Sequence, residues 1–489
     1  MSESTRRRAT ASLIASLSLV QLGCGAAGER APTVVPPIVV PTIGKLVIVL
    51  EPRGNGRDAD GFSAAIDGAS TRTLTSDASV AYDSLSPGNH TVRIADIAPQ
   101  CAASADSITR AVKVGATDTV TVGMTCLGGF AYLQDVDANT TDLFYLTEDG
   151  RTIQLTNGPG LKFIEAWSPD GTQLLYSQEQ TNGWRIHTVR ADGTDSRPLT
   201  SDVGNEFSPR WSPDGTHIAY QKGDSTGVYI AISDPDGANV HPLAGTSPVD
   251  FGPSWSADGS RLYFGCYRFQ RIYDLCTAAL DGSDLRPIRY AALDPIVTPC
   301  TPACTVVPIQ FAASPDGLTI AIELAPGQGP VLERVWAASV DGTSAIPLSG
   351  NTISFAGRWS PSGDRMLLNI SDGGTGYAMA TVNTDGSSYR QIVSYADSIS
   401  SGDWSPDGTV IAYNDLRTRQ IGAMNADGSN RRPLTTGIGK GTPIWNPKAR
   451  AVGTLSSDRV RVSAPNLEKT PILSRLRPEM LRRSLHPRP

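Results

Sequence analysis

The sequence predicts an all-β fold in which a β-propeller follows a small immunoglobulin-like β-sandwich. A tryptophan joined to a Ser-Pro-Asp-Gly turn recurs through most of the chain, and an Asp-Gly turn follows each of the first six copies. Copies and near-copies start at Trp167, Trp211, Trp255, Ala313, Trp359, Trp404 and Trp445, at steps of 44, 44, 58, 46, 45 and 41 residues. Units of roughly 40–50 residues with four short strands each are typical of propeller blades.

The repeated motif is a turn signal. Proline presets φ at the second position of a tight turn, aspartate tolerates the third, and glycine takes the left-handed fourth. The tryptophan ends the incoming strand, and we expect the outgoing strands at 173–177, 217–221, 261–265, 319–323, 365–369 and 410–414. Six of the eight tryptophans occupy the same repeat position, so we expect them to pack between neighbouring blades.

The number of units sets the expected number of blades. Residues 130–134, 143–147 and 153–156 copy the last three strands of a unit and precede seven units that carry the motif strand. The last of these is eroded, at 451–455, 460–463 and 471–473. We therefore expect eight blades within residues 128–474. Seven is the alternative, if the first three strands pair with the strand that ends at Trp445.

The N-terminus has the pattern of an export signal. Arg6, Arg7 and Arg8 precede a modest apolar stretch, 9–22, which ends at Gly23-Cys24. This end resembles the lipobox of bacterial lipoproteins, although Gln21 stands where that family favours leucine. The resemblance implies that residues 1–23 are a lipoprotein signal peptide and that Cys24 is lipidated. A plain signal peptide is the alternative. No other stretch approaches the ~18 apolar residues that a transmembrane helix needs.

Seven cysteines support this interpretation, because an even set of six remains once Cys24 is set aside. In an exported protein an even set indicates disulfides. Cys101 and Cys126 fall in one domain and form the natural first pair. Cys266 and Cys276 lie on adjacent expected strands, which leaves Cys300 and Cys304 to close a small loop. A zinc site made by the last four is the alternative.

The regions outside the propeller are simpler. Residues 24–44 form a linker rich in proline and valine, which should be extended and stiff. Residues 45–127 predict the β-sandwich, with strands at 45–51, 62–67, 80–84, 89–94 and 118–123. The stretch 85–94 is similar to small immunoglobulin-like repeats of bacterial surface proteins. Residues 475–489 form a basic tail, either solvated or in contact with anionic lipid.

The repeats resemble the TolB-type, WD40-like β-propeller repeat: an aromatic residue, Ser-Pro-Asp-Gly, an apolar strand, Asp-Gly and Leu-Thr. Residues 211–215, 218–220, 192–193 and 199–200 carry this pattern. The resemblance implies an envelope protein that binds proteins or peptides. The same repeat forms the gating propeller of prolyl-oligopeptidase-like hydrolases. TolB itself has six blades and a different N-terminal domain, so this chain departs on both counts.

No catalytic or metal centre is expected. The match to Gly-x-Ser-x-Gly at 223–227, with Ser225, lies between two expected blade strands rather than between a strand and a helix. Asp135, Asp137 and Asn139 have the initial spacing of a calcium loop but lack its glycine and distant glutamate. The net charge of −6 gives no case for nucleic acid. We expect no enzymatic activity and no cofactor.

We expect a partner to bind at the axial channel, which the innermost strand of each blade lines. The residues just before the motif tryptophan point along the channel wall if the tryptophan packs between blades. The charged residues at this level are Glu165, Arg210, Arg358 and Asp403. We expect a lipid-anchored module of the outer membrane, facing periplasm or cell surface, that binds an envelope protein or peptide. The alternatives are a carbohydrate-binding surface protein and a non-catalytic relative or partner of a prolyl-oligopeptidase-like hydrolase.

Overall fold

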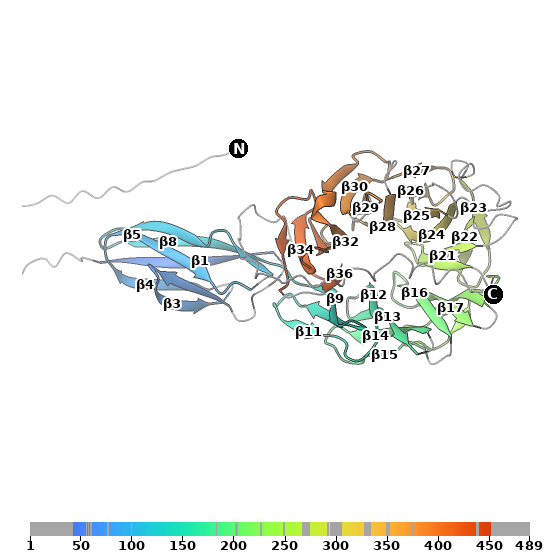
Figure 1. Cartoon of the computed structure of the whole chain (residues 1–489), viewed down its shortest axis with the longest axis horizontal. Helices are drawn as coiled ribbons and strands as arrows, with labels where there is room; N and C mark the ends of the chain where they lie inside the picture. The colour runs from blue at the N-terminus through green and yellow to red at the C-terminus, as the bar shows by residue number, and fades with distance from the viewer. Residues whose placement is uncertain are drawn as a thin grey trace, which may run out of the picture.

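The computed structural model describes residues 43–450, apart from 55, 57, 59–60, 76–77, 99, 182, 201–203, 225–226, 248–249, 267–273, 291–292, 294–305, 327–333, 349–352, 374–375 and 437–439. Within these residues the chain forms a sandwich of strands and a ring of sheets (Figure 1). One short 3-10 helix, Tyr395–Asp397, interrupts the strands. Among the described residues no helix has the length and apolar character needed to cross a membrane.

The sandwich consists of two four-stranded sheets. The first has the order β4 (Ser79–Leu85), β1 (Gly44–Arg53), β8 (Thr117–Cys126) and β6 (Cys101–Ala103). The second has the order β3 (Ala69–Leu74), β2 (Phe62–Ile66), β5 (Gly88–Ala95) and β7 (Ser107–Val112). Alternate residues of β1, such as Leu46 and Ile48, are fully buried against Phe62 of the other sheet. The predicted strands are present, and β3, β6 and β7 were not predicted.

The ring consists of seven four-stranded blades, written here from the innermost strand outward. Blade 1 is β36 (Lys440–Trp445), β9 (Phe130–Asp137), β10 (Thr140–Leu146) and β11 (Thr152–Gln154). Blade 2 is β12 (Lys162–Trp167), β13 (Gln173–Gln180), β14 (Gly183–Arg190) and β15 (Arg197–Pro198), and blade 3 is β16 (Asn205–Trp211), β17 (Ile218–Asp224), β18 (Gly227–Ser233) and β19 (His241–Pro242). Blade 4 is β20 (Phe251–Trp255), β21 (Arg261–Cys266), β22 (Asp274–Ala279) and β23 (Arg286–Ile288).

The other three blades repeat this pattern. Blade 5 is β24 (Val306–Ala313), β25 (Thr319–Pro326), β26 (Arg334–Ser339) and β27 (Ala345–Pro347). Blade 6 is β28 (Ile353–Trp359), β29 (Arg365–Ser371), β30 (Tyr377–Asn383) and β31 (Arg390–Val393). Blade 7 is β32 (Ile399–Trp404), β33 (Val410–Asp415), β34 (Gln420–Asn425) and β35 (Arg432–Pro433). Figure 1 shows the innermost strands arranged around a central axis.

The prediction of eight blades is wrong for the part of the chain that the structure describes. β36 pairs antiparallel with β9, with Lys440 opposite Gln134 and Trp445 opposite Phe130. The unpaired edge of β9 is thus covered by a strand from the other end of the repeats, and three early strands complete a blade instead of starting their own. This is the seven-bladed alternative. The expected strands at 451–455, 460–463 and 471–473 lie outside the described residues.

The six motif tryptophans pack between neighbouring blades, as predicted; blade 5 has Ala313 at this position. Those at the ends of β12, β16, β20, β32 and β36 are buried, and that of β28 is half-buried. The indole N–H of Trp255 donates to the carbonyl of Arg210 in the preceding blade at 2.9 Å. Trp359 and Trp404 make the same bond to the blade before each of them, at 3.0 and 3.1 Å. Trp167 closes the circle by donating to Ile444 of blade 1 at 3.3 Å.

The Ser-Pro-Asp-Gly turns explain why this motif recurs. In blade 3 the hydroxyl of Ser212 donates to Asp214 at 2.6 Å and accepts the backbone N–H of His217 at 2.9 Å. The same Asp214 carboxylate accepts the backbone N–H of Thr216, and Gly215 takes a φ of 74°. Serine and aspartate therefore satisfy the backbone of the turn, and glycine supplies the left-handed residue.

Two predicted disulfides are present. Cys101 pairs with Cys126 between β6 and β8 of the sandwich. Cys266 pairs with Cys276 between β21 and β22 of blade 4. Cys300 and Cys304 lie outside the described residues, as does Cys24.

Candidate binding site in the axial channel

Every innermost strand has an irregularity near its motif position. In six blades the register against the neighbouring strand shifts two or three residues before that position, as between Phe207 and Arg210 of β16. In blade 5 it shifts earlier, between Pro308 and Gln310. A β-bulge bends the strand and re-aims the side chains beside it. Antiparallel pairing places the Ser-Pro-Asp-Gly turns, which follow these bulges, together on one face of the ring, called here the turn face. The bulges thus lie toward the turn-face end of the channel.

Three blades hold a non-glycine residue in the left-handed region at this bulge. Ser208 has a φ of 51°, Ser401 of 51° and Thr442 of 32°, and Gly252 takes 63° at the equivalent point of blade 4. Such residues are uncommon, and a β-branched residue there is a genuine outlier. Backbone strain of this kind persists only where the surroundings enforce it, and it gathers at ligand sites. The backbone is therefore strained at the bulges of blades 1, 3 and 7, and glycine relieves that strain in blade 4.

The four predicted residues are brought together at this level as two ion pairs. Arg210 of blade 3 lies 3.6 Å from the carboxylate of Glu165 in blade 2. Arg358 of blade 6 lies 4.0 Å from the carboxylate of Asp403 in blade 7. Each pair therefore bridges two neighbouring blades, and blade 1 and blades 4 and 5 separate the pairs along the ring.

The two pairs interact electrostatically, although they lie on different blades. The positive charge of Arg358 acts on both Glu165 and Arg210, although blade 6 is not adjacent to blade 2 or blade 3. Charges on non-adjacent blades interact most directly through the space at the centre of the ring. The four side chains thus form one cluster, called here the channel cluster, with a formal charge of zero.

Restricted access to water shifts the pKa values of this cluster. Burial raises the pKa of Glu165, while Arg210 and a hydrogen bond from Ser177 oppose the shift. Burial likewise raises the pKa of Asp403, opposed by Arg358 and by the backbone N–H of Trp445, which donates to it at 2.8 Å. Burial lowers the pKa of Arg210. Perturbed groups that share one cavity are typical of functional sites, although structural ion pairs also produce them.

The channel cluster still reaches solvent. The side chains of Glu165 and Asp403 are 19% and 16% exposed, and those of Arg210 and Arg358 are 31% and 44% exposed. Ile444, Ser254 and Ala312 stand just before the motif position in blades 1, 4 and 5, which contribute none of the four charges, so small or apolar residues occupy this position between the charged pairs. Desolvated ion pairs add little net stability. Their presence where a partner could replace the missing water favours a binding role.

Sequence reasoning missed the bulge and its strained residues. Proline stands two residues before the motif tryptophan at Pro209, Pro253 and Pro443. Since proline cannot donate to a sheet ladder, its presence inside a strand signals a bulge. That signal was available in the sequence.

The other candidate residues do not join the channel cluster. Asp135 forms an ion pair with Arg419 of blade 7, and Asp137 accepts the backbone N–H of Asn139 at 2.8 Å in the turn between β9 and β10. Ser225 lies outside the described residues, between β17 and β18. Across the described residues no group of three or more His, Cys, Asp or Glu side chains is arranged to hold a metal ion.

Comparisons with known proteins find similarity only among solved structures. No protein-family model matches the sequence, and no curated protein matches it. Among solved structures, the chain is similar to TolB from Acinetobacter baumannii at 16% identity, over 68% of this chain and 83% of that one, with a TM-score of 0.41.

Two other solved structures are similar at the same level. An oligogalacturonate lyase in complex with manganese has 15% identity, with 63% and 85% covered and a TM-score of 0.44. A puromycin hydrolase has 16% identity, with 64% and 53% covered and a TM-score of 0.46. The propeller predicted from the TolB-type repeats is itself confirmed by the strand pairing of this chain.

Proposed function

We propose that this chain is an exported, lipid-anchored binding module of the bacterial envelope that captures a protein or peptide at the turn-face end of its channel. The observation that carries this proposal is the channel cluster, in which four charges from four blades meet in a partly dehydrated space. No catalytic step and no cofactor belong to the proposal.

The physical argument concerns what a partner gains there. The two carboxylates and Arg210 are held in a poorly hydrated place, which costs free energy while the channel is empty. A partner that presents complementary charge replaces the missing water and strengthens every charge–charge contact, because the local dielectric constant is low. The more exposed Arg358 meets the partner first, and such a charge mainly sets the association rate and the register of the complex.

A cross-linking experiment identifies the partner. A photo-reactive amino acid at Ala312, on the channel wall, should cross-link the partner in envelope preparations. The same amino acid at Tyr389, an exposed residue that directly precedes the outermost strand of blade 6, serves as the control. Cross-linking of one product from both positions, or from Tyr389 alone, would place the partner outside the channel.

The double change Arg210→Ala with Arg358→Ala then tests the residues. Its matched control is Arg197→Ala with Arg286→Ala. These two arginines lie on the outermost strands β15 and β23 and form ion pairs with Asp195 and Asp284. We expect the channel variant to weaken binding about tenfold or more and to flatten its dependence on salt. The control should do neither. Unchanged affinity and unchanged salt dependence in the channel variant would refute the proposal.

A further inference from the structure

The connection between the sandwich and the propeller is only a few residues long, and both of its ends are held. Cys126 is the last residue of β8, and Phe130 begins β9. Leu127 is fully buried in the cluster that contains Phe130, Leu434 and Trp445, so the first residue after the sandwich already packs inside the propeller. Gly129 donates its backbone N–H to Leu146 at 2.6 Å and accepts that of Asn446 at 2.8 Å.

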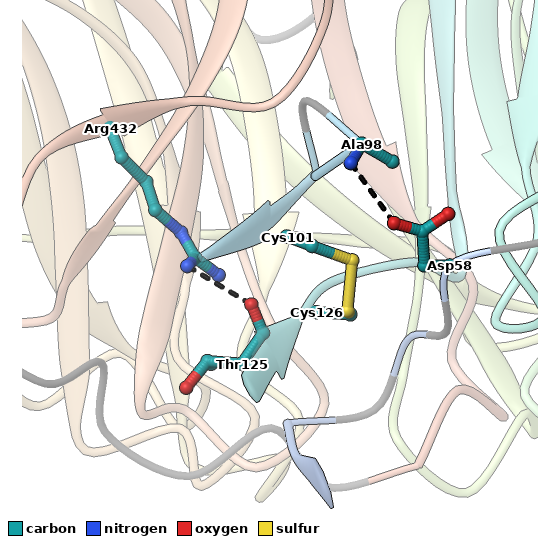
Figure 2. Close-up of a disulfide and its surroundings, with 6 residues drawn as sticks. All are labelled: Asp58, Ala98, Cys101, Thr125, Cys126 and Arg432. Atoms are coloured by element: carbon teal, nitrogen blue, oxygen red, sulfur yellow. Dashed lines mark hydrogen bonds between the residues drawn. A yellow bond between two sulfur atoms is a disulfide. The ribbon is translucent and has the colours of Figure 1, made fainter. Parts of the chain in front are cut away.

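Backbone hydrogen bonds from the sandwich also hold this connection. The backbone N–H of Leu127 donates to Gln100 at 3.0 Å, and the carbonyl of Cys126 accepts the N–H of Gly56 at 2.9 Å. A Cβ added to Gly56 would lie 2.5 Å from the carbonyl carbon of Leu127, so the backbones meet at a distance that only glycine permits. Gln100 directly precedes Cys101 in the chain. The disulfide from Cys101 to Cys126 holds the start of β6 beside the end of β8 (Figure 2).

Direct contact between the two bodies is limited. Arg432 of β35 reaches across and donates to the carbonyl of Thr125 at 3.1 Å, as Figure 2 shows. Its Nε and one terminal nitrogen are buried without a hydrogen-bond partner. A cavity of about 290 Å³ lies beside this contact, between Gln100 of the sandwich and Tyr132, Phe144 and Leu434 of blades 1 and 7. Since the interface is incompletely packed, non-covalent contact alone holds it weakly.

We propose that the Cys101–Cys126 disulfide is a redox-sensitive latch that fixes the orientation of the propeller on the sandwich. In the oxidised protein the end of β8 cannot separate from β6, so the chain enters the propeller from a fixed point. An external dithiol opens the latch by thiol–disulfide exchange: its two thiols become a disulfide, and Cys101 and Cys126 become two thiols. The end of β8 then frays, and the propeller pivots about residues 127–129.

The latch stands apart from the channel proposal. It concerns the joint, and it holds or fails whether or not a partner binds in the channel. Both sulfurs are buried, so reduction requires local opening and should be slower than that of an exposed disulfide. The Cys266–Cys276 disulfide, which is also buried but lies inside blade 4, is the natural comparison.

Distance measurements between the two bodies test the latch. Spin labels are attached through non-canonical amino acids at Val114 of the sandwich and Leu318 of blade 5, both exposed. Four full-length proteins are compared by pulsed electron resonance: the oxidised wild type, Cys101→Ala with Cys126→Ala, Cys266→Ala with Cys276→Ala, and Arg432→Leu. We expect one narrow distribution in all except the Cys101/Cys126 variant, which should be broad.

Several results would contradict the proposed latch. A Cys101/Cys126 variant as narrow as the wild type, or a broad distribution in the oxidised wild type, would overturn the latch. A broad distribution for Arg432→Leu would show that the non-covalent contact holds the joint instead. If the Cys101/Cys126 variant fails to fold, amide exchange of the wild type with and without dithiol replaces it. Exchange at Leu127 should then rise about tenfold or more while that of β1 stays unchanged. Equal rates at Leu127 with and without dithiol would overturn the latch.

Discussion

The hydrogen bond from a motif tryptophan to the preceding blade can be tested by comparing Trp255, whose indole N–H makes this bond, with Trp211, whose indole N–H does not. Trp255 and Trp211 occupy the same position in neighbouring blades and are similarly buried, at 6% and 9% exposure. The indole N–H of Trp255 donates to the carbonyl of Arg210 at 2.9 Å. That of Trp211 is buried without an acceptor among the described residues. Phenylalanine at either position removes similar ring area.

The expected costs follow from the difference. Trp255→Phe removes the donor that the carbonyl of Arg210 accepts from, and a partner left unsatisfied in this way costs roughly 1–3 kcal/mol. Trp211→Phe loses no hydrogen bond and removes an unsatisfied buried N–H. Because the loss of ring contact is common to both, the free energy of unfolding should fall by about 1–3 kcal/mol more for Trp255→Phe than for Trp211→Phe.

Urea unfolding followed by the fluorescence of the remaining tryptophans measures this difference. The comparison is valid if both variants keep the wild-type m-value, which reports the surface exposed on unfolding. If the two variants lose the same stability within about 0.5 kcal/mol, the indole bond does not join the blades and ring packing alone explains the repeated tryptophan.

Three further predictions concern single positions. Gly54 and Gly68 share a φ of 75°, but their surroundings differ. A Cβ at Gly54 would lie 2.4 Å from the carbonyl oxygen of Cys126, while one at Gly68 meets nothing within 4 Å. In unfolding experiments Gly68→Ala should therefore lower the free energy of unfolding by about 1–2 kcal/mol, and Gly54→Ala should lower it clearly more. Hydrogen bonds from Ser212 and the N–H of Thr216 lower the pKa of Asp214 from 3.8 to about 2, so its stabilisation is present above about pH 4 and lost as the pH falls toward 2, and the deficit of Asp214→Asn should vanish over that interval. Burial, with Lys162 and Arg185, lowers the pKa of His187 from 6.5 to about 4. Since the unfolded chain takes up that proton first, stability should fall from about pH 6.5 to pH 4, His187→Gln should flatten this dependence, and an NMR titration of His187 near pH 6.5 would contradict the burial argument.

The sequence was most informative where structure is local. The motif turns were predictable because Ser212, Asp214 and Gly215 satisfy a backbone that lies within a few residues of them. The short strands β6 and β7 carry little alternation of their own and form by pairing with longer strands, so they were missed. The blade count failed for a related reason: whether β9 starts a blade or completes one depends on a partner about 300 residues away, which no local pattern reports.

The candidate site was predictable in part. Alternation around the motif tryptophan placed Glu165, Arg210, Arg358 and Asp403 on the innermost strands, where the structure has them; their role in binding stays a prediction. It could not indicate that Arg358 acts on charges two or more blades away, because that depends on the diameter and closure of the ring. The bulge was signalled by Pro209 and its equivalents, but the left-handed backbone of Thr442 had no sequence signal, since threonine rarely adopts it.

The pairing of β36 with β9 has a consequence for biosynthesis. Until residue 445 has left the ribosome, β9 presents a bare sheet edge that can join other chains. Blades 2 to 7 can form in order as they are made, but the circle is completed only when nearly the whole propeller exists. Closure of so distant a pair is entropically expensive and slow. A chain cut short before Lys440 would keep six blades and an open seam, with Asp403 deprived of the N–H of Trp445.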